Sequence, residues 1–475
     1  MTDIRKYRQW RASRRAGVAA TGFEVDPRDL HPSLRDDQRA VVAWALKRGR
    51  AALFINTGGG KAFDLLEWNK QVARLSGKRC IMFAPLAVAD QLVREGERWG
   101  IEIAYVRDQA QADETKCPIV ISNYELMDRF TPSAFVAVSM DESSIIKHSD
   151  SQTRNMVNKM WAHTPYRLFA TATPAPNEYD ELGNHSQALG IMPWHEMITR
   201  WFIRDSDQAD TLRLKGHARR DFWRWVASWA VCMTKPSDLG FDDTGFDLPP
   251  LNVHHITVDQ DPESAWETGR LFHLESLSAT EMHANKRATL KDRCEKAADI
   301  VNAEPSEPCV VWVETNDEAD AMQALLPDAI EVRGNDALDD KRATLRAFSE
   351  GRERVLITKL GIAGFGMNWQ HCRRTVFASM SFSFERTYQG LKRFHRYGQT
   401  RPVDAYMITA ANEANIARSY RDKERQFVAM QLQMNDAMRE VGLLANAPRF
   451  DDYDYNPTRR MNLPPFVRTK EPIYA

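Results

Sequence analysis

The chain has 475 residues, of which 43% are hydrophobic and 27% charged, and its net charge is −1. Such a composition is ordinary for a soluble globular protein of two or three domains, and no apolar run approaches the ~20 residues that cross a bilayer. Because the net charge is close to zero, any binding of nucleic acid must depend on local positive patches.

The first residues, MTDIRKYRQWRASRR, are basic and lack the apolar core of a secretion signal, so we expect a cytoplasmic protein that is not exported. The stretch from Arg5 to Arg15 contains six basic residues and no acidic one. It forms either a solvated tail or an arm that contacts phosphates. The six cysteines show no spacing typical of a metal site or a disulfide framework. We interpret them as buried apolar residues of a reducing compartment.

The stretch NTGGGKAFD, residues 56–64, follows the apolar run AALFI and precedes a helical pattern. A glycine loop between a strand and a helix presents backbone N–H groups to a phosphate, and a lysine reaches the β and γ oxygens. Gly58, Gly59, Gly60 and Lys61 supply these parts. The alternative is a flexible turn without a ligand.

Four further apolar runs follow at wide intervals: RCIMFAP, PIVISNYE, FVAVSMDE and YRLFATATP. Helical periodicity between them predicts a parallel sheet covered on both faces. Asp141 and Glu142 end the third run, where one acid can hold Mg²⁺ and its neighbour can orient or deprotonate water, although adjacent acids at a strand end also occur by chance. Thr171 and Thr173 close the fourth run, on the side where such sheets bind ligands.

Residues 190–250 are rich in tryptophan and charge. Phe222, Val226 and Trp229, with Trp225 alongside, make one apolar helical stripe, which predicts a helix packed on the first lobe; the alternative is a role in stacking on DNA. The following PSDLGFDDTGFDLPP has the composition of a linker.

A second series of apolar runs begins after Pro250: PCVVWVE, AIEVRG, RVLITK, RTVFASM and DAYMIT. The chain therefore reads as two α/β lobes in tandem. In TYQGLKRFHRYGQ, the offsets of Gln389, Arg393 and Arg396 predict one helical face, from which two guanidiniums could stabilise a transferring phosphoryl group. The alternative is a solvated basic face. A polar helical stretch runs from residue 412 to about 444, and an irregular tail follows.

The order of LRDDQ, GGGKA, APLAV, ISNYE, MDESS, ATATP, ITKLGIAGFGMNW and YQGLKRFHRYGQ resembles the motifs of superfamily-two helicases. The ending HRYGQT looks like the Swi/Snf branch, and LKGHARRDFWRWVASWAV with PSDLG resembles the DEAD-like helicases of bacteriophages. The resemblance covers roughly residues 20 to 410. It implies a basic arm (1–22), a RecA-like lobe that binds ATP (23–190), a helical extension and linker (191–250), a second RecA-like lobe (251–411) and a helical segment with an irregular tail (412–475). If the chain is phage-encoded, the compartment is the cytoplasm of the bacterial host.

The resemblance also implies roles for individual residues. Gln38 would contact the adenine of ATP, Asp141 would hold Mg²⁺ and Glu142 would activate water, while Arg393 and Arg396 would act as arginine fingers with Gln389 beside the γ-phosphate. The nucleotide would be held by Gln38, Thr57, Gly58, Gly59, Gly60, Lys61 and Ala62. The segments expected to approach a nucleic acid or couple it to the ATP site contain Pro85, Ser122, Asn123, Tyr124, Thr171, Thr173, Thr358, Gly364 and Asn368.

Two positions depart from the family pattern. Ala62 stands where the family has the threonine or serine whose hydroxyl ligates Mg²⁺. A water can replace that ligand, but if misplacement of the ion costs ~3 kcal/mol of transition-state stabilisation, the rate falls about a hundredfold. Asn56 stands where many Swi/Snf relatives carry an acid, and the sequence predicts no chemical consequence of this change.

We therefore expect a nucleic-acid-dependent ATPase that uses ATP and Mg²⁺, either a DNA helicase or a translocase on double-stranded DNA, slowed by Ala62. The alternatives are a clamp that binds ATP and DNA without hydrolysis, an RNA-directed remodeller, and a motor subunit that requires a nuclease partner. A protein partner could bind through the N- or C-terminal tail.

Overall fold

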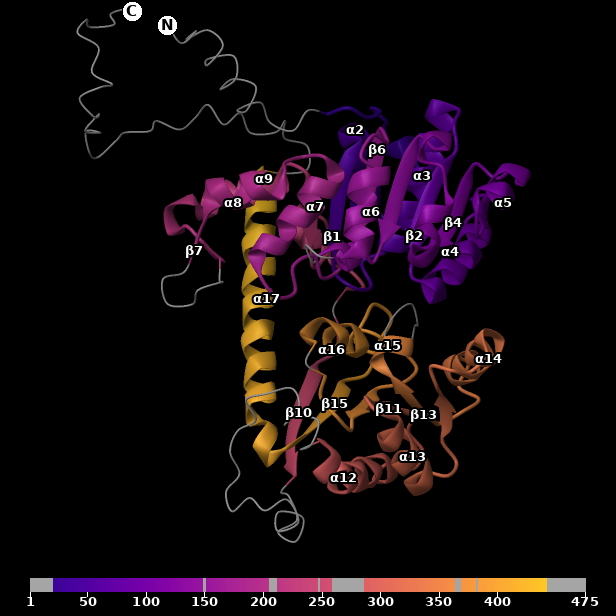
Figure 1. Ribbon diagram of the computed structural model, residues 1–475, viewed down its shortest axis with the longest axis vertical. Coiled ribbons are helices and arrows are strands. Elements are labelled where there is room, and N and C mark those ends of the chain that lie inside the picture. Colours follow the sequence, from indigo (N-terminus) through magenta and orange to yellow (C-terminus); the bar gives the residue numbers. More distant parts are fainter. Residues whose placement is uncertain are drawn as a thin grey trace, which may run out of the picture.

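The computed structural model describes residues 20–147, 151–204, 212–246, 248–258, 286–363, 369–381 and 383–441. Within these residues the chain forms two α/β lobes, one above the other in Figure 1, which confirms the predicted fold class of two tandem RecA-like lobes. The basic stretch from Arg5 to Arg15 and the tail from residue 442 onward lie outside the described residues. No described helix is both long enough and apolar enough to span a membrane.

The first lobe is built on a seven-stranded parallel sheet with the order β3-β4-β2-β5-β6-β1-β9. All the residues of β2, β4 and β5 are buried, although successive side chains point to opposite faces. Both faces of the sheet are therefore covered, as the apolar runs predicted. The strands are β1 (Arg50–Ile55), β2 (Cys80–Ala84), β3 (Ile103–Tyr105), β4 (Ile119–Asn123), β5 (Ala137–Asp141), β6 (Tyr166–Ala170) and β9 (Ala230–Met233).

Helices connect and cover these strands (Figure 1). For example, α2 packs on β1, α3 on β5 and α7 on β6. The α-helices of this part of the chain are α2 (Asp36–Arg48), α3 (Lys61–Ser76), α4 (Leu86–Arg98), α5 (Gln109–Glu114), α6 (Gln152–Met160), α7 (Leu182–Leu189), α8 (Trp194–Trp201) and α9 (Arg219–Ala227). The short 3-10 turns are η1 (Pro27–Asp29), η2 (Tyr124–Arg129), η3 (Pro132–Ala134), η4 (Ser143–Ile146), η5 (Tyr179–Glu181), η6 (Gly216–Ala218) and η7 (Pro236–Leu239).

The first lobe extends beyond the predicted boundary at residue 190. Strand β9 pairs with β1 in parallel and closes the edge of the first sheet, so part of the expected extension belongs to this lobe. The hairpin of β7 (Phe202–Arg204) and β8 (Leu212–Leu214) and helix α9 precede it. The tryptophan-rich stripe is buried, with Trp225 5.4 Å from Trp229 and Trp229 5.8 Å from Phe54 between ring centroids. The predicted helix packed on the first lobe is confirmed as α9, but this helix ends at Ala227, so Trp229 of the predicted stripe lies in the turn that follows it.

The second lobe is built on a six-stranded parallel sheet with the order β10-β15-β14-β11-β13-β12. Its strands are β10 (Leu251–Val258), β11 (Cys309–Val313), β12 (Ile330–Val332), β13 (Val355–Lys359), β14 (Arg374–Phe377) and β15 (Val403–Ala410). Its helices are α12 (Leu290–Asn302), α13 (Asn316–Leu325), α14 (Leu338–Ser349), α15 (Leu360–Ala363) and α16 (Phe384–Leu391), followed by the 3-10 turn η8 (Ala411–Glu413).

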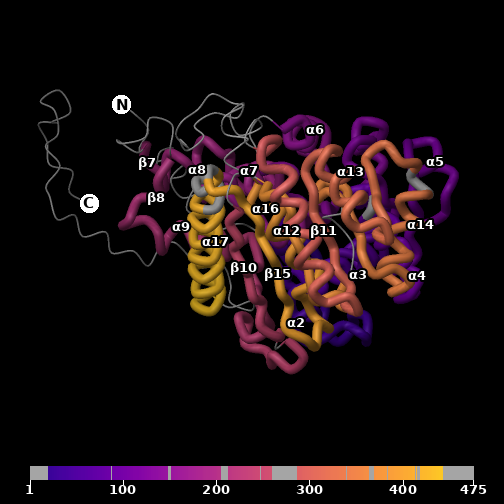
Figure 2. The backbone as a smooth tube through the Cα atoms, turned by 90° about the horizontal axis from the view of Figure 1, so that it is seen from below, coloured from indigo at the N-terminus to yellow at the C-terminus, as the bar shows by residue number. Residues whose placement is uncertain are grey.

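Helix α17 (Ala414–Val441) leaves the second lobe and returns to the first, as the yellow helix in Figures 1 and 2 shows. Its end is fastened to the first lobe by several side chains. Asn435 Nδ2 donates to Asp238 Oδ2 at 2.8 Å and Arg439 pairs with Asp238 Oδ1 at 2.7 Å, while Trp223 Nε1 donates to Gln433 at 2.7 Å. The sequence predicted this helix, and the structure adds that it joins the two lobes.

All six cysteines are unpaired thiols. Five are buried and Cys117 is half-buried, which agrees with their interpretation as small apolar side chains.

Candidate active site between the lobes

The glycine loop lies between the end of β1 and the start of α3. Gly58 and Gly60 have φ angles of +87° and +97°, which L side chains rarely adopt. A methyl group on Gly59 would lie 2.3 Å from Ile55 Cγ2, and one on Gly60 would lie 2.4 Å from Gln38 Nε2. The loop therefore requires glycine, and the N-terminus of α3 that follows it can receive an anion.

Lys61 is the first residue of α3 and its side chain is buried. Its Nζ donates to the carbonyl of Ile55 at 2.9 Å, on the strand that precedes the loop. Burial lowers the pKa of Lys61, and the nearby Glu142 and Asp141 oppose this shift. The ammonium group thus stands in a dry site that already contains two acids.

The two acids end β5 and begin the turn after it. Glu142 has φ +52° and is the only non-glycine residue with a positive φ in the described part of the chain. Such backbone strain costs on the order of 1–3 kcal/mol and is concentrated at functional sites. The Glu142 N–H donates to Asp141 Oδ1 at 3.0 Å, and burial, with the charge of Glu142, raises the pKa of Asp141 to about 7. Glu142 Oε2 is buried without a hydrogen-bond partner among the described residues.

The second lobe contributes Gln389, Arg393 and Arg396. The prediction that one helix carries all three is wrong, because α16 ends at Leu391 and both arginines lie in the turns that follow. Arg393 is buried, and burial lowers its pKa against the opposing charges of Glu142 and Asp141. Burial, followed by the charge of Arg393, lowers the pKa of Arg396 to about 10. The turns thus bring two cations to the acids of the first lobe.

The second lobe also touches the glycine loop. A methyl group on Gly58 would lie 3.0 Å from the backbone nitrogen of Tyr397 and 3.5 Å from Arg396 Cβ. Tyr388, in α16, donates its hydroxyl hydrogen to Asn56 Oδ1 at 2.9 Å. Asn56, to which the sequence gave no chemical consequence, is therefore a contact between the loop and the opposite lobe. Its position before the glycines gave no sign of this partner, which is distant in sequence.

A polar chain joins the lobes next to the acids. Lys147 pairs with Glu385 across the lobes, and Thr173 Oγ1 donates to Glu385 Oε1 at 2.9 Å. Gln389 Nε2 in turn donates to Thr173 Oγ1 at 3.3 Å. Motif order pointed to Thr173 and Gln389, whereas Lys147 and Glu385 are recognised only from the tertiary contact.

Gln38 lies beside the loop. Its Nε2 donates to Asp64 Oδ1 at 2.9 Å and to the carbonyl of Gly60 at 3.3 Å. The neighbouring Arg35 donates to the carbonyl of Gly59 at 2.9 Å. Gln38 thus lies within reach of the loop that would hold phosphates, and its contact with adenine stays a prediction.

Of the described residues that were expected near a nucleic acid, two line a groove between the lobes and five are buried elsewhere. Pro85 and Tyr124 line a groove between the lobes, and the Tyr124 hydroxyl donates to the carbonyl of Asp141 at 2.5 Å. Asn123 is also buried, and its Oδ1 accepts from the Tyr105 hydroxyl at 2.9 Å. Four further side chains are buried and have no surface open to a polymer in this conformation: Ser122, Thr171, Thr173 and Thr358. Gly364 and Asn368 lie outside the described residues.

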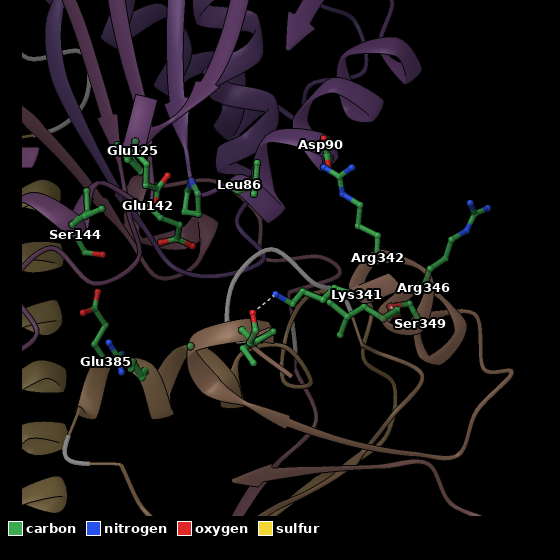
Figure 3. A pocket seen from close by; sticks show the side chains of 18 of the residues that line it. Leu86, Asp90, Glu125, Glu142, Ser144, Lys341, Arg342, Arg346, Ser349 and Glu385 are labelled. Carbon is green, nitrogen blue, oxygen red and sulfur yellow. Dashed lines mark hydrogen bonds and ion pairs between the residues drawn. The ribbon is translucent and has the colours of Figure 1, made fainter. Parts of the chain in front are cut away.

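The groove has a volume of about 1530 Å³ and opens beside the acids, with Glu142 on its wall (Figure 3). From the first lobe it is lined by α4 and the turns after β4 and β5, and from the second by α14 and the start of α16. Arg342 on α14 pairs with Asp90 on α4 across it. Its cationic lining consists of Arg94, Lys147, Lys341, Arg342, Arg346, Arg352 and Arg386.

The residues fit a nucleotide with magnesium. No cluster of three or more His, Cys, Asp and Glu suited to a metal occurs in the described ranges. A magnesium ion that arrives with a nucleotide needs only one or two carboxylates, because phosphates and waters complete its shell. Asp141 can supply that carboxylate, and its charge acts directly on Lys61. Ala62, partly buried against the core, offers a methyl group in place of a hydroxyl ligand.

No protein-family model matches the chain, and no curated protein matches it either. Among solved structures, the chain is similar to the SWI2/SNF2 ATPase core of Sulfolobus solfataricus in complex with double-stranded DNA. The identity is 14% and the TM-score is 0.42, over 87% of this chain and 96% of that chain. At this level of similarity, the residues of the site itself must carry any functional conclusion.

Proposed function

We propose that the chain is an ATP hydrolase that couples hydrolysis to movement on nucleic acid, with double-stranded DNA as its track. One observation carries the proposal: in a buried interface beside a glycine loop, the charges of Asp141 and Glu142 of the first lobe act on Arg393 of the second, and the charge of Glu142 acts on Arg396. Burying charges costs free energy unless they are paired, and buried groups with perturbed pKa values are concentrated at functional sites. Two lobes that each bring half of a charged site suit a reaction that proceeds only when they are closed.

The residues divide the work of phosphoryl transfer to water. The glycine loop, the start of α3 and Lys61 bind the phosphates. Asp141 would hold Mg²⁺, which would supply positive charge to offset that of the phosphates. Glu142, whose Oε2 has no partner in the described part of the site, orients the attacking water and accepts its proton. Arg393 and Arg396 stabilise the charge that develops on the transferring group, and Gln389 lies beside it.

The groove is the proposed path of the nucleic acid. Seven cations and five acids line it, with Arg94 on α4 and Lys341, Arg342 and Arg346 on α14 among the cations, and phosphates are the usual partners of such cations. Glu142 and Glu385 line the same groove, so a polymer in it would lie against the polar chain that reaches Gln389. Closure on ATP and opening after hydrolysis would move the two walls relative to each other. The choice of duplex DNA rests on the resemblance of HRYGQT to the Swi/Snf ending.

A second candidate is a clamp that binds ATP and DNA without turnover. It is favoured by Ala62, because the missing hydroxyl removes a direct ligand of Mg²⁺. The complete set of Glu142, Arg393 and Arg396 favours the motor, since a clamp has no chemical need for a water-activating acid.

The test is phosphate release from ATP and Mg²⁺ without polymer and with duplex DNA, single-stranded DNA or RNA. The chain is compared with Glu142→Gln and with Ala62→Thr. We expect release by the chain that duplex DNA stimulates most and that Glu142→Gln abolishes. Activity of Ala62→Thr alone would support the clamp, and stimulation by RNA above DNA would support an RNA-directed remodeller. If neither the chain nor Ala62→Thr exceeds Glu142→Gln under any condition, the motor proposal fails.

A further inference from the structure

We propose that Tyr388 is a positioning residue that, through Asn56, holds the glycine loop in the geometry required for hydrolysis when the second lobe is closed. The catalytic part of this inference rests on the proposed function, whereas the structural part concerns the loop alone. Asn56 and Tyr388 are separated by 332 positions in the chain and belong to different lobes. Their hydrogen bond can therefore exist only when the lobes meet.

One side-chain oxygen of Asn56 accepts hydrogen bonds both from the loop and from the opposite lobe. Asn56 Oδ1 accepts from the Thr57 N–H at 2.8 Å, from Thr57 Oγ1 at 3.4 Å and from the Tyr388 hydroxyl at 2.9 Å. Because the Thr57 N–H can only donate, the amide must present its oxygen here. The backbone N–H of Asn56 donates to Met233 of β9 at 2.9 Å. The backbone of Asn56 is thus fixed to the first sheet, and its side chain links the turn of the loop to Tyr388.

The ring of Tyr388 is packed between residues of the second lobe and α17. Its ring lies 5.1 Å from Phe427 of α17 and 5.7 Å from Phe384, and Lys392 Nζ lies 5.4 Å above the ring. Burial raises the pKa of Tyr388, so its hydroxyl remains protonated and available as a donor. The ring of Tyr388 is thus packed against its own helix and against α17, and its hydroxyl is directed to Asn56 in this closed arrangement of the lobes.

Tyr388 precedes in the chain the residues of the second lobe to which catalytic roles are proposed. Gln389, the next residue, donates to Thr173, and Arg393 and Arg396 follow in the adjoining turns. The movement that brings these groups to the nucleotide therefore also brings the Tyr388 hydroxyl to the loop. An asparagine suits this role because its amide accepts hydrogen bonds without adding a negative charge beside Asp141, Glu142 and the incoming phosphates.

The experiment combines hydrogen exchange and kinetics on the full chain. Tyr388→Phe removes the donor, Asn56→Ala removes the acceptor and Asn56→Asp keeps an acceptor while adding charge. Tyr166→Phe is the matched control, because Tyr166 packs on Phe23 at the first residue of β6, at the amino-terminal end of the strands, whereas the loop follows the carboxyl end of β1. Amide exchange in residues 56–60 is measured without nucleotide, and phosphate release and the affinity for a non-hydrolysable ATP analogue are measured in parallel.

We expect Tyr388→Phe to speed exchange of the Thr57 amide by about 3- to 10-fold, the effect of one neutral hydrogen bond. Its kcat should fall by a similar factor, with affinity for the analogue within about twofold. Asn56→Ala should accelerate exchange at least as much. In Asn56→Asp the acceptor oxygen is kept, so exchange of the Thr57 amide should stay as slow as in the unsubstituted chain. Its KM should rise, because the carboxylate repels the phosphates.

Unchanged exchange in Tyr388→Phe, or the same acceleration in Tyr166→Phe, would overturn the inference. A fall in analogue affinity larger than the fall in kcat would also overturn it, because the bond would then serve binding alone. If the unsubstituted chain releases no phosphate, the proposed function fails, while the exchange of Tyr388→Phe still decides whether the contact shapes the loop.

Discussion

The two ends of the contact between the lobes use charge in opposite ways. At the nucleotide end, Lys61, Asp141, Glu142 and Arg393 are all buried. At the groove end, the side chains of Arg342 and Arg346 are 45% and 77% exposed. Charges interact far more strongly in a dry site than beside water, where salt also screens them. Substitutions at the nucleotide end should therefore have large effects that depend little on salt, whereas those at the groove end should be smaller and salt-dependent.

The largest expected effect is that of Arg396→Ala. The loss of an arginine that stabilises the transferring phosphoryl group should lower kcat by about a thousandfold or more, with a much smaller change in nucleotide affinity. Steady-state phosphate release at saturating ATP measures it. Arg401→Ala, in the same lobe, removes an exposed arginine that pairs with Glu307 at 3.0 Å, and it should leave kcat unchanged. Equal losses in both variants would contradict the assignment.

Ala62→Thr should act in the opposite direction at the same end. A hydroxyl that ligates Mg²⁺ directly should raise turnover, by up to about a hundredfold if it recovers ~3 kcal/mol. It should also lower the Mg²⁺ concentration required for half-maximal activity. A magnesium titration of phosphate release measures both quantities. If turnover does not change, a water already occupies the position of the hydroxyl without penalty.

At the groove end, Arg346→Glu should weaken binding to nucleic acid and reduce its dependence on salt. Replacing one phosphate contact by an acid should lower the slope of log K against log salt by about one. Fluorescence anisotropy at several salt concentrations measures this. The matched control is Arg425→Glu on α17, because Arg346 and Arg425 each pair with an acid three or four residues away in the chain and are 77% and 79% exposed. Equal weakening by both would show that the groove has no special role.

The smallest expected effect is that of Asp90→Asn. The change removes the negative charge that pairs with Arg342 across the groove, and we expect the affinity for nucleic acid to rise by a few-fold, because exposed ion pairs contribute about 1 kcal/mol or less. Asp113→Asn breaks the comparable pair with Arg79 at 3.3 Å, away from the groove, and should change nothing. A fall in affinity for Asp90→Asn would mean that the pair holds the groove open.

The failures of sequence-based prediction share one physical cause. The helix predicted through Arg396 has helical spacing, but it ends at Leu391, where the chain turns into the interface to bury Arg393. The first lobe was predicted to end at residue 190, but its sheet also includes β9. This strand has only four residues, and its place in the sheet is set by pairing with β1, which is far away in the chain. Asn56 seemed inert because its partner lies in the other lobe. Each error concerns a contact between distant segments, which local periodicity does not encode.

By itself, the sequence determined the two α/β lobes, the glycine loop and the acids at the end of β5. These depend on local features: apolar runs long enough for buried strands, glycines where φ must be positive, and polar residues at strand ends. The tertiary structure decided which charges meet. It brought Arg393 and Arg396 to Glu142, Tyr388 to Asn56 and Arg342 to Asp90, because burial and the closing of two lobes select partners that no local pattern specifies.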